Sequence, residues 1–279
     1  MKISKVSLTD FRNYSTAQVE FEPSLNVIEG RNTAGKTNLM EAVYCCGVGK
    51  SPRASKDRDM IRFGQEEAHI TVWVDKRFRS HRIDYHLTQR GLKKVLVDNQ
   101  PIRRIADLMG VLNVVYFSPD ELKIIKDEPS ERRRFVNISL CQQNPAYYTA
   151  LSNYNKVLEQ RNALLKEETP TLREELAIWD EQLAKEGAII VHLRQDFLST
   201  IATLADRYHR LIAGDKNDLS LTYVTQVVGD TVEDTRNLLL ARLKAGYDKE
   251  LHTHYTVTGP HRDDFVVESL GQDLKQFGS

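Results

Sequence analysis

Apolar and polar positions alternate along much of the first 117 residues, which is typical of β-strands. The pattern is clearest where Ile70, Val72 and Val74 occupy every second position. It predicts strands within residues 3–28, ending in the apolar run 25–28, and at residues 68–74, 82–88, 93–97 and 111–117. One helix is expected at residues 37–46. This part of the chain is therefore predicted to be a mixed β/α unit.

The pattern changes after residue 118, where apolar residues recur at spacings of three and four. Thr169-Pro170-Thr171 interrupts this periodicity and predicts two antiparallel helices, the longer of them roughly 60 Å at 1.5 Å per residue. Strands are expected at residues 219–228 and 265–269, with a helix at 232–243 between them. We therefore predict a helical arm, residues 118–215, inserted into a head formed by residues 1–117 and 216–279.

Composition is that of an ordinary globular protein. The 279 residues are 41% apolar and 28% charged, which excludes collagen-like and disordered chains. The longest apolar run, residues 42–48, is too short to cross a bilayer, and the N-terminus resembles a strand rather than a signal peptide. Three cysteines form no disulfide framework, and Cys45 and Cys46 are expected to be buried. These features predict a reduced, cytoplasmic chain.

Charge is balanced overall, with 39 basic and 39 acidic residues, but it is unevenly distributed. Residues 50–104 hold 14 Lys/Arg and 7 Asp/Glu, whereas residues 151–279 hold 15 and 21. The basic region suits an anionic partner. Its candidate DNA contacts are Lys93, Lys94, Arg103 and Arg104; the alternative is that these side chains are only solvated.

Gly30-Arg31-Asn32-Thr33-Ala34-Gly35-Lys36-Thr37 fits the phosphate-loop pattern G-x-x-x-x-G-K-[ST] without a mismatch. Backbone amides from Asn32 to Asn38 would face an anion at the start of the following helix. Lys36 would place a positive charge on the β- and γ-phosphates, and the Thr37 hydroxyl would bind Mg²⁺. The motif therefore predicts a nucleotide–Mg²⁺ site.

A phosphate loop does not define the reaction. The Asn-Lys-x-Asp motif with which a GTPase reads its base is missing. A metabolic kinase would need lid arginines, a role open to Arg132, Arg133 and Arg134. A nucleotide-clamped interaction module is a third possibility. The helical block between two strand-rich segments favours a DNA-repair ATPase over these alternatives.

Five motifs in order give the chain a resemblance to a known family. They are Phe11-Arg12-Asn13-Tyr14, the loop from Gly30 to Asn38, Tyr116-Phe117-Ser118-Pro119-Asp120-Glu121-Leu122, Pro129-Ser130-Glu131-Arg132-Arg133-Arg134-Phe135 and Gly259-Pro260-His261-Arg262-Asp263-Asp264. Together they resemble the bacterial RecF family, whose ATPase heads are related to those of SMC proteins. The resemblance covers essentially the whole chain.

The resemblance implies an α/β, P-loop ABC/SMC-type ATPase head with an inserted α-helical domain. It also implies an ATP-dependent homodimer that binds gapped DNA or single-strand/double-strand junctions. Such a protein would help RecO and RecR to load recombinase during gap repair and the SOS response. By the same resemblance, Arg12 would lie near the nucleotide phosphates.

The family continues beyond the position of Ser279 into a signature sequence and a Walker B strand. Residues 95–98 are the nearest Walker B mimic here, and we interpret them as part of a hairpin. We therefore expect an incomplete head that binds ATP, hydrolyses it at or near background and does not form the ATP-driven dimer.

Overall fold

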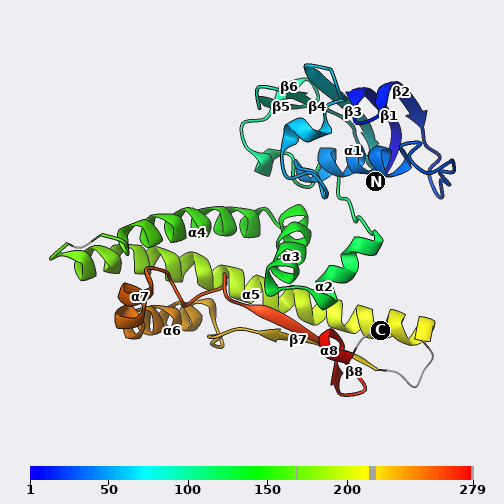
Figure 1. Ribbon diagram of the computed structural model, residues 1–279. Helices are drawn as coiled ribbons and strands as arrows, with labels where there is room; N and C mark the ends of the chain where they lie inside the picture. The colour runs from blue at the N-terminus through cyan, green and yellow to red at the C-terminus, as the bar shows by residue number, and fades with distance from the viewer. Residues whose placement is uncertain (168, 214–217, 278–279) are drawn as a thin grey trace. The chain divides into compact units, whose positions relative to one another are not determined.

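Two units divide the chain, residues 1–117 and residues 118–279 (Figure 1). The computed structural model describes residues 1–167, 169–213 and 218–277. The side chains of Asp120 and Phe277 also lie outside this description.

The first unit is built on an antiparallel sheet with the strand order β2-β1-β3-β4-β5-β6. Its strands are β1 (Lys2–Phe11), β2 (Tyr14–Glu20), β3 (Glu67–Asp75), β4 (Ser80–Thr88), β5 (Lys93–Val97) and β6 (Gln100–Pro101). Asp98 and Asn99, with φ of 52° and 65°, form the turn between β5 and β6. That turn confirms the hairpin interpretation of residues 95–98.

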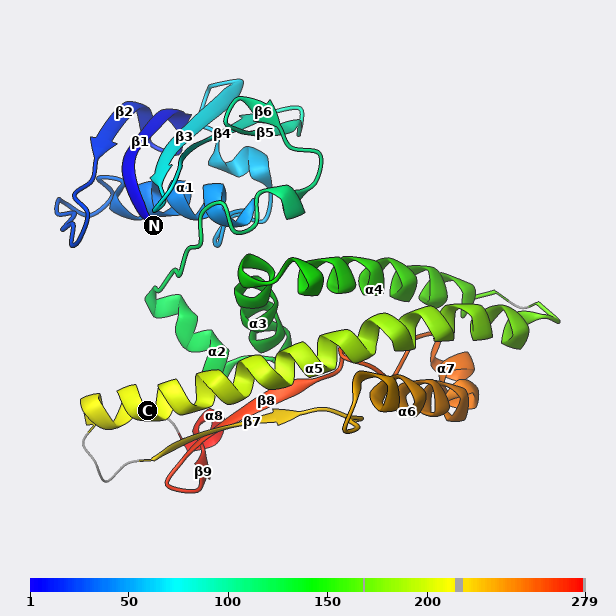
Figure 2. The same ribbon diagram turned by 180° about the vertical axis from the view of Figure 1, so that it is seen from behind.

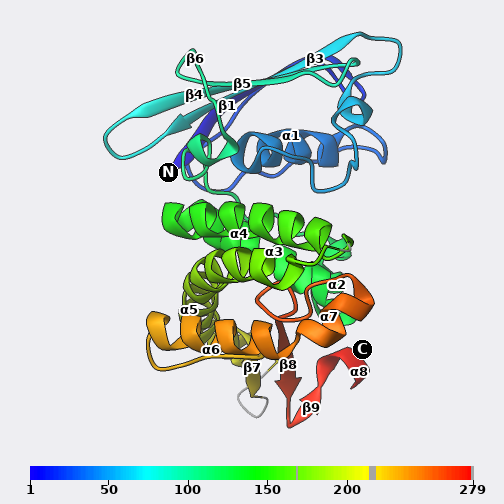
Figure 3. The same cartoon turned by 90° about the vertical axis from the view of Figure 1, so that its left-hand side faces the viewer.

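Helix α1 (Lys36–Val48) covers one face of this sheet (Figure 3). Alternate residues of the central strands face the helix because side chains alternate across a strand. Ile70 and Val72 of β3 and Ile83 of β4 are almost completely buried there. Cys45 and Cys46 lie in the same core, as expected. Polar residues at the intervening positions occupy the opposite face.

Two expected strands are absent from the described part of the first unit. Residues 25–28 and 111–117 are not paired, and Leu25, Val27 and Val115 are 81%, 80% and 98% exposed. An apolar run becomes a strand only when a neighbouring strand satisfies its backbone groups, and neither run has such a neighbour. The strands expected at residues 68–74, 82–88 and 93–97 are found.

Helices dominate the second unit (Figure 2). They are α2 (Lys123–Lys126), α3 (Pro129–Gln143), α4 (Pro145–Leu164), α5 (Leu172–Ala213), α6 (Val232–Ala245), α7 (Tyr247–Thr253) and α8 (Leu274–Phe277). A short 3₁₀ turn at Pro119–Leu122 precedes α2, and the first unit has two more, at Asp57–Met60 and Ile105–Asp107. None of the helices in the described ranges carries an apolar stretch of the length that a membrane crossing needs.

The helix pair α4–α5 follows the predicted pattern. Asn144 caps α4, its Oδ1 accepting hydrogen bonds from the amides of Ala146 and Tyr147, and Pro145 occupies the first helical position. Within the core, Arg161 of α4 pairs with Asp180 of α5.

The last part of the described chain packs on α5. Strands β7 (Leu219–Val224), β8 (Asp264–Ser269) and β9 (Gln272–Asp273) form an antiparallel sheet of their own. We expected residues 216–279 to join the first 117 residues in one head. The structure instead groups the described part of this segment with the helices, because β7 and α6 contact α5.

Candidate functional site

The glycine-rich segment of residues 30–35 leads directly into α1, which begins at Lys36. Gly30, Thr33 and Gly35 have φ of 150°, 70° and 104°. These angles curl the backbone into a loop, which glycine permits at little cost. The first amides of a helix have no acceptor within the helix and carry its positive dipole end. The segment therefore offers an anion-binding concavity where α1 starts.

Lys36 is held over this loop. Its Nζ donates hydrogen bonds to the carbonyl oxygens of Gly30, at 2.6 Å, and Arg31, at 2.9 Å. Thr37 is exposed in the first turn of α1. An ammonium and a hydroxyl are thus available at the mouth of the loop, and they fit a phosphate with its bound Mg²⁺.

The turn between β1 and β2 supports the loop from the side. A Cβ on Gly35 would lie 2.7 Å from Asn13 Oδ1 and 2.8 Å from Tyr14 Oη, so only glycine fits. Asn13 Nδ2 donates to the carbonyl of Thr33 at 3.3 Å, and Asn13 Oδ1 accepts from Asn38 Nδ2 at 2.9 Å. These contacts bring the Phe11–Tyr14 motif and the phosphate-loop motif together in one site.

A buried carboxylate anchors the same turn to α1. Glu41 is fully buried and accepts hydrogen bonds from Arg12 Nε at 2.9 Å and Arg12 Nη2 at 2.7 Å. Ser51 Oγ and Arg53 Nη2 also donate to it, each at 2.5 Å. Burial would raise the pKa of Glu41, but the hydrogen bonds from Arg12, Ser51 and Arg53 hold it below its ordinary value. Glu41 is therefore a stable anion that positions two arginines.

A cleft of about 1070 Å³ opens beside this cluster, entirely within the first unit. Its wall includes Arg12, Asn38, Arg53 and Arg58. Arg53 Nη2 donates to Asn38 Oδ1 at 2.6 Å, which connects the cleft wall to the first turn of α1. The arginines, together with Asp59 and Glu66, give the cleft a charged lining close to the phosphate loop.

Sequence reasoning missed Glu41, Ser51, Arg53 and Asn13 as parts of the site. Glu41 did carry a signal, because it is the one carboxylate of α1 and is followed by the apolar residues 42–48. An acid in such a position is buried only when it is paired. Its partners could not be read from the sequence, because Arg12 lies 29 residues away on another element.

All four candidate DNA contacts are exposed, and one of them, Lys93, is also engaged within the unit. Lys93 Nζ donates to the carbonyl of Gly49 at 3.0 Å and pairs with Asp57 at 2.9 Å. Lys94, Arg103 and Arg104 are exposed, and Arg104 Nη2 lies 3.3 Å from Asp107 Oδ1. Their contact with DNA stays a prediction.

The three consecutive arginines of α3, residues 132–134, make contacts within the second unit rather than forming a lid. Arg132 forms a bidentate pair with Asp264, at 2.6 Å and 2.8 Å, and Arg133 donates to the carbonyl of Asp263 at 2.9 Å. Arg134 lies 3.4 Å from Glu131. These contacts remove Arg132 and Arg133 from the role that a metabolic kinase would need.

The His261–Asp264 motif is a buried turn. His261 Nε2 donates to the carbonyl of Thr256 at 3.0 Å, so Nδ1 accepts from the Tyr154 hydroxyl at 2.6 Å. Burial lowers the pKa of His261 to about 4, which keeps the ring neutral. Asp263 accepts a short hydrogen bond from the Tyr223 hydroxyl and lies 3.7 Å from Arg194. The motif thus holds β8 against the helices.

Comparisons with known proteins match the whole chain. A family model described as the RecF/RecN/SMC N terminal domain matches residues 2–228. The chain is 41% identical to the DNA replication and repair protein RecF of Agathobacter rectalis and 39% identical to that of Lachnoclostridium phytofermentans. Each alignment covers 100% of this chain and 76% of the relative.

Solved structures agree with the sequence relatives. The recombination mediator protein RecF-ATP in the RecFOR pathway superposes with a TM-score of 0.92 at 29% identity. That alignment covers 100% of this chain and 76% of the solved chain. The corresponding RecF-ATPrS structure gives a TM-score of 0.91 at 28% identity.

Proposed function

The chain belongs to the RecF family of P-loop, SMC-type ATPase heads, and on that premise we propose that it is an ATP-binding recombination mediator that acts on DNA. One observation carries the nucleotide half of this proposal. The loop of residues 30–37 stands at the start of α1 with Lys36 above it and Gly35 packed on Asn13 and Tyr14. A solved relative with the same fold is a RecF–ATP structure.

We place the triphosphate of ATP on the loop. Lys36 Nζ would then leave the carbonyl oxygens of Gly30 and Arg31 and bind phosphate oxygens instead. The Thr37 hydroxyl would hold Mg²⁺, which neutralises phosphate charge when bound. Arg12 and Arg53 line the adjoining cleft, where Glu41 fixes their guanidinium groups. The cleft would take the remainder of the nucleotide, and the fixed arginines would orient it at little entropic cost.

DNA is the proposed macromolecular partner, contacted through the basic region of residues 50–104. Exposed Lys94, Arg103 and Arg104 suit phosphate contacts, which carry no sequence preference. We further propose that the protein works in the cytoplasm with RecO and RecR at single-strand gaps, and that the ATP-dependent homodimer is a property of full-length members of the family. The RecFOR pathway named for the solved relative supports this assignment.

A DNA-binding titration on this chain tests the proposal. Fluorescence anisotropy would compare gapped and blunt duplexes, each with and without ATP–Mg²⁺. We expect ATP to tighten binding to the gapped duplex, and Lys36→Ala to remove that effect while leaving ATP-independent binding intact. Equal affinity for both duplexes, unchanged by ATP, would contradict the proposed function.

A further inference from the structure

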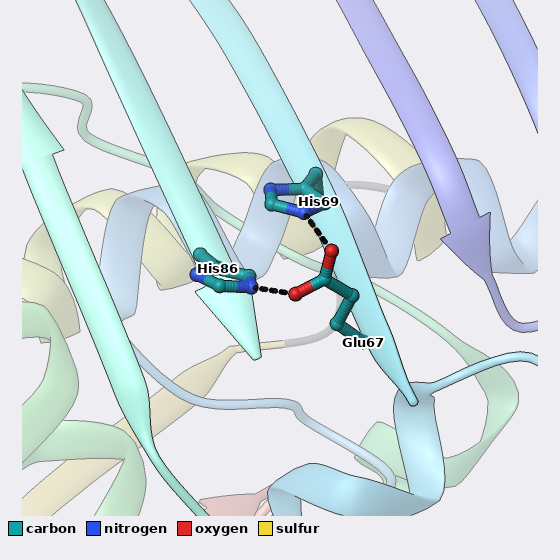
Figure 4. Close-up of side chains that lie close together, drawn as sticks. All are labelled: Glu67, His69 and His86. Carbon is teal, nitrogen blue, oxygen red and sulfur yellow. Dashed lines mark hydrogen bonds and ion pairs between the residues drawn. The ribbon is translucent and has the colours of Figure 1, made fainter. Parts of the chain in front are cut away.

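The outer face of the first sheet, opposite α1, carries two histidines and a glutamate side by side (Figure 4). Glu67 and His69 belong to β3, two residues apart, so their side chains share a face. His86 of β4 stands directly opposite His69 in the antiparallel register. The nucleotide site does not use any of these three residues.

The three side chains converge through their ligand-forming atoms. His86 Nε2 lies 3.0 Å from Glu67 Oε2, and His69 Nε2 lies 3.4 Å from Glu67 Oε1. The two imidazoles are stacked, with centroids 4.1 Å apart and planes inclined by 7°. All three ligand atoms lie within 4.8 Å of one another.

We propose that Glu67, His69 and His86 bind a divalent transition-metal ion, with Zn²⁺ as the ion that this donor set suits best. Two imidazole nitrogens and one carboxylate form a common zinc donor set, and a water molecule completes the tetrahedron. Zinc–nitrogen distances of about 2.0–2.1 Å require the ligand atoms to close to roughly 3.3 Å.

The movement that brings the three ligand atoms to this spacing is small and local. The side chains of Glu67, His69 and His86 are 55%, 45% and 28% exposed, so they can rotate without displacing a packed neighbour. Their backbones are fixed by the β3–β4 pairing, which runs without a break from Glu67 to Asp75. The strands therefore preorganise the ligands, and only side-chain torsions adjust.

Charged neighbours on β4 and β5 lie next to the three ligands. Lys94 of β5 stands opposite His86 and opposes a cation, while Asp84 lies two residues before His86 and favours it.

Zinc competition against a chromophoric chelator tests the site. The chain should be free of affinity tags and of ATP, which itself binds metal. We expect one Zn²⁺ per chain, with affinity reduced about tenfold or more by His69→Ala, His86→Ala or Glu67→Gln. His252→Ala is the matched control, since it removes an exposed histidine of α7, and it should leave the affinity unchanged.

Imidazole ¹⁵N NMR supplies the second measurement. Zn²⁺ should shift the Nε2 resonances of His69 and His86 and leave His252 in place. His69→Gln and His86→Gln keep a polar side chain of similar size if an alanine variant unfolds. Zinc affinity that is the same in all ligand variants as in the wild type would overturn the site. ATP affinity should be equal in wild type and variants, so failure here is distinguishable from failure of the proposed function.

Discussion

Gly35 bears two separate constraints. Its φ of 104° lies in the region that L side chains rarely adopt, and a Cβ there would collide with Asn13 and Tyr14. Gly91 has a similar φ of 82°, but nothing lies within 4 Å of the place where its Cβ would stand. An alanine at Gly91 would therefore introduce backbone strain alone. An alanine at Gly35 would introduce the same strain and also disturb the packing of the β1–β2 turn on the phosphate loop.

Gly35→Ala should destabilise the first unit more than Gly91→Ala does. Backbone strain costs about 1–2 kcal/mol in either variant, and the collision with Asn13 and Tyr14 adds about 1–3 kcal/mol at Gly35 alone. Urea unfolding gives the free energy of unfolding of each variant. It is followed by Trp73 fluorescence in a Trp179→Phe background, because Trp73 lies in the first unit. Equal losses in the two variants would show that the turn does not support the loop.

Glu41 links acid stability to the site. Its pKa in the folded protein lies below the ordinary value of 4.5, so its contribution is complete above that pH. It is lost as the pH falls through the folded-state value, where the carboxylate takes up a proton. Arg12 and Arg53 then lose their shared partner.

Glu41→Gln should lower the free energy of unfolding by about 2–3 kcal/mol at pH 7, since two guanidinium groups lose their anion. The difference from wild type should shrink as the pH falls below about 4.5 and through the lower folded-state pKa of Glu41, where the buried carboxylate becomes neutral. Urea unfolding at a series of pH values tests this, with Glu22→Gln as an exposed control. A difference that does not depend on pH would exclude the ionised carboxylate as the anchor.

At the level of single residues, the sequence was informative where chemistry is local. Residues 30–37 are contiguous, so their spacing alone predicted the loop and the lysine above it. A lid role was left open for Arg132, but in the structure Arg132 is buried and pairs with Asp264, 132 residues away. An ion pair between residues so far apart in the sequence depends on the fold, and a local sequence pattern does not predict it.

Among the secondary-structure elements, those that carry their own periodicity were predicted best. Helices α4 and α5 and strands β3 and β4 show regular apolar spacing and a defined break or turn. Residues 25–28 and 111–117 were wrongly predicted as strands. Their apolar runs satisfy a strand pattern, but pattern alone does not supply the hydrogen-bonding neighbour.

Helices α4, α5 and α7 meet at a buried ion cluster. Arg161 lies 2.7 Å from both Asp180 and Glu250, and all three side chains are fully buried. The same helices α5 and α7 also share the exposed pair Arg173–Asp248, at 2.7 Å. The two interactions have the same length and differ in solvent exposure.

Arg161→Ala should destabilise the second unit by about 3–5 kcal/mol, because two buried carboxylates lose their cation. Arg173→Ala should cause no measurable loss, because exposed ion pairs are screened by water. Urea unfolding followed by Trp179 fluorescence in a Trp73→Phe background compares them. Similar losses in both variants would show that burial does not set the strength of these contacts.

At the scale of the whole molecule, the boundary after Phe117 was predicted, but the assignment of the last segment was not. Alternation identified β7 and β8 as strands, and we assigned them with residues 216–279 to a head shared with residues 1–117. They pair with each other, β7 packs on α5 and β8 contacts α3, and Phe265 of β8 is 4% exposed. Sheet membership is decided by packing between distant elements.

DNA affinity should depend on salt more than on sequence. If the basic region of the first unit is the DNA face, each phosphate contact contributes about 0.9 to the slope of log affinity against log salt. Arg103→Ala with Arg104→Ala should weaken binding evenly across sequences and flatten the slope. Arg173→Ala serves as the control in the second unit. An unchanged slope in the double variant would place the DNA face elsewhere.

The central claim is that residues 30–37 bind ATP through Lys36, and titration calorimetry on this chain tests it most directly. Wild type and the exposed-lysine control Lys249→Ala should bind ATP–Mg²⁺ with equal affinity. Lys36→Ala should show no detectable binding while keeping its circular dichroism and urea midpoint, because Lys36 is not a core residue. Wild-type ATP affinity in a folded Lys36→Ala chain would contradict the account.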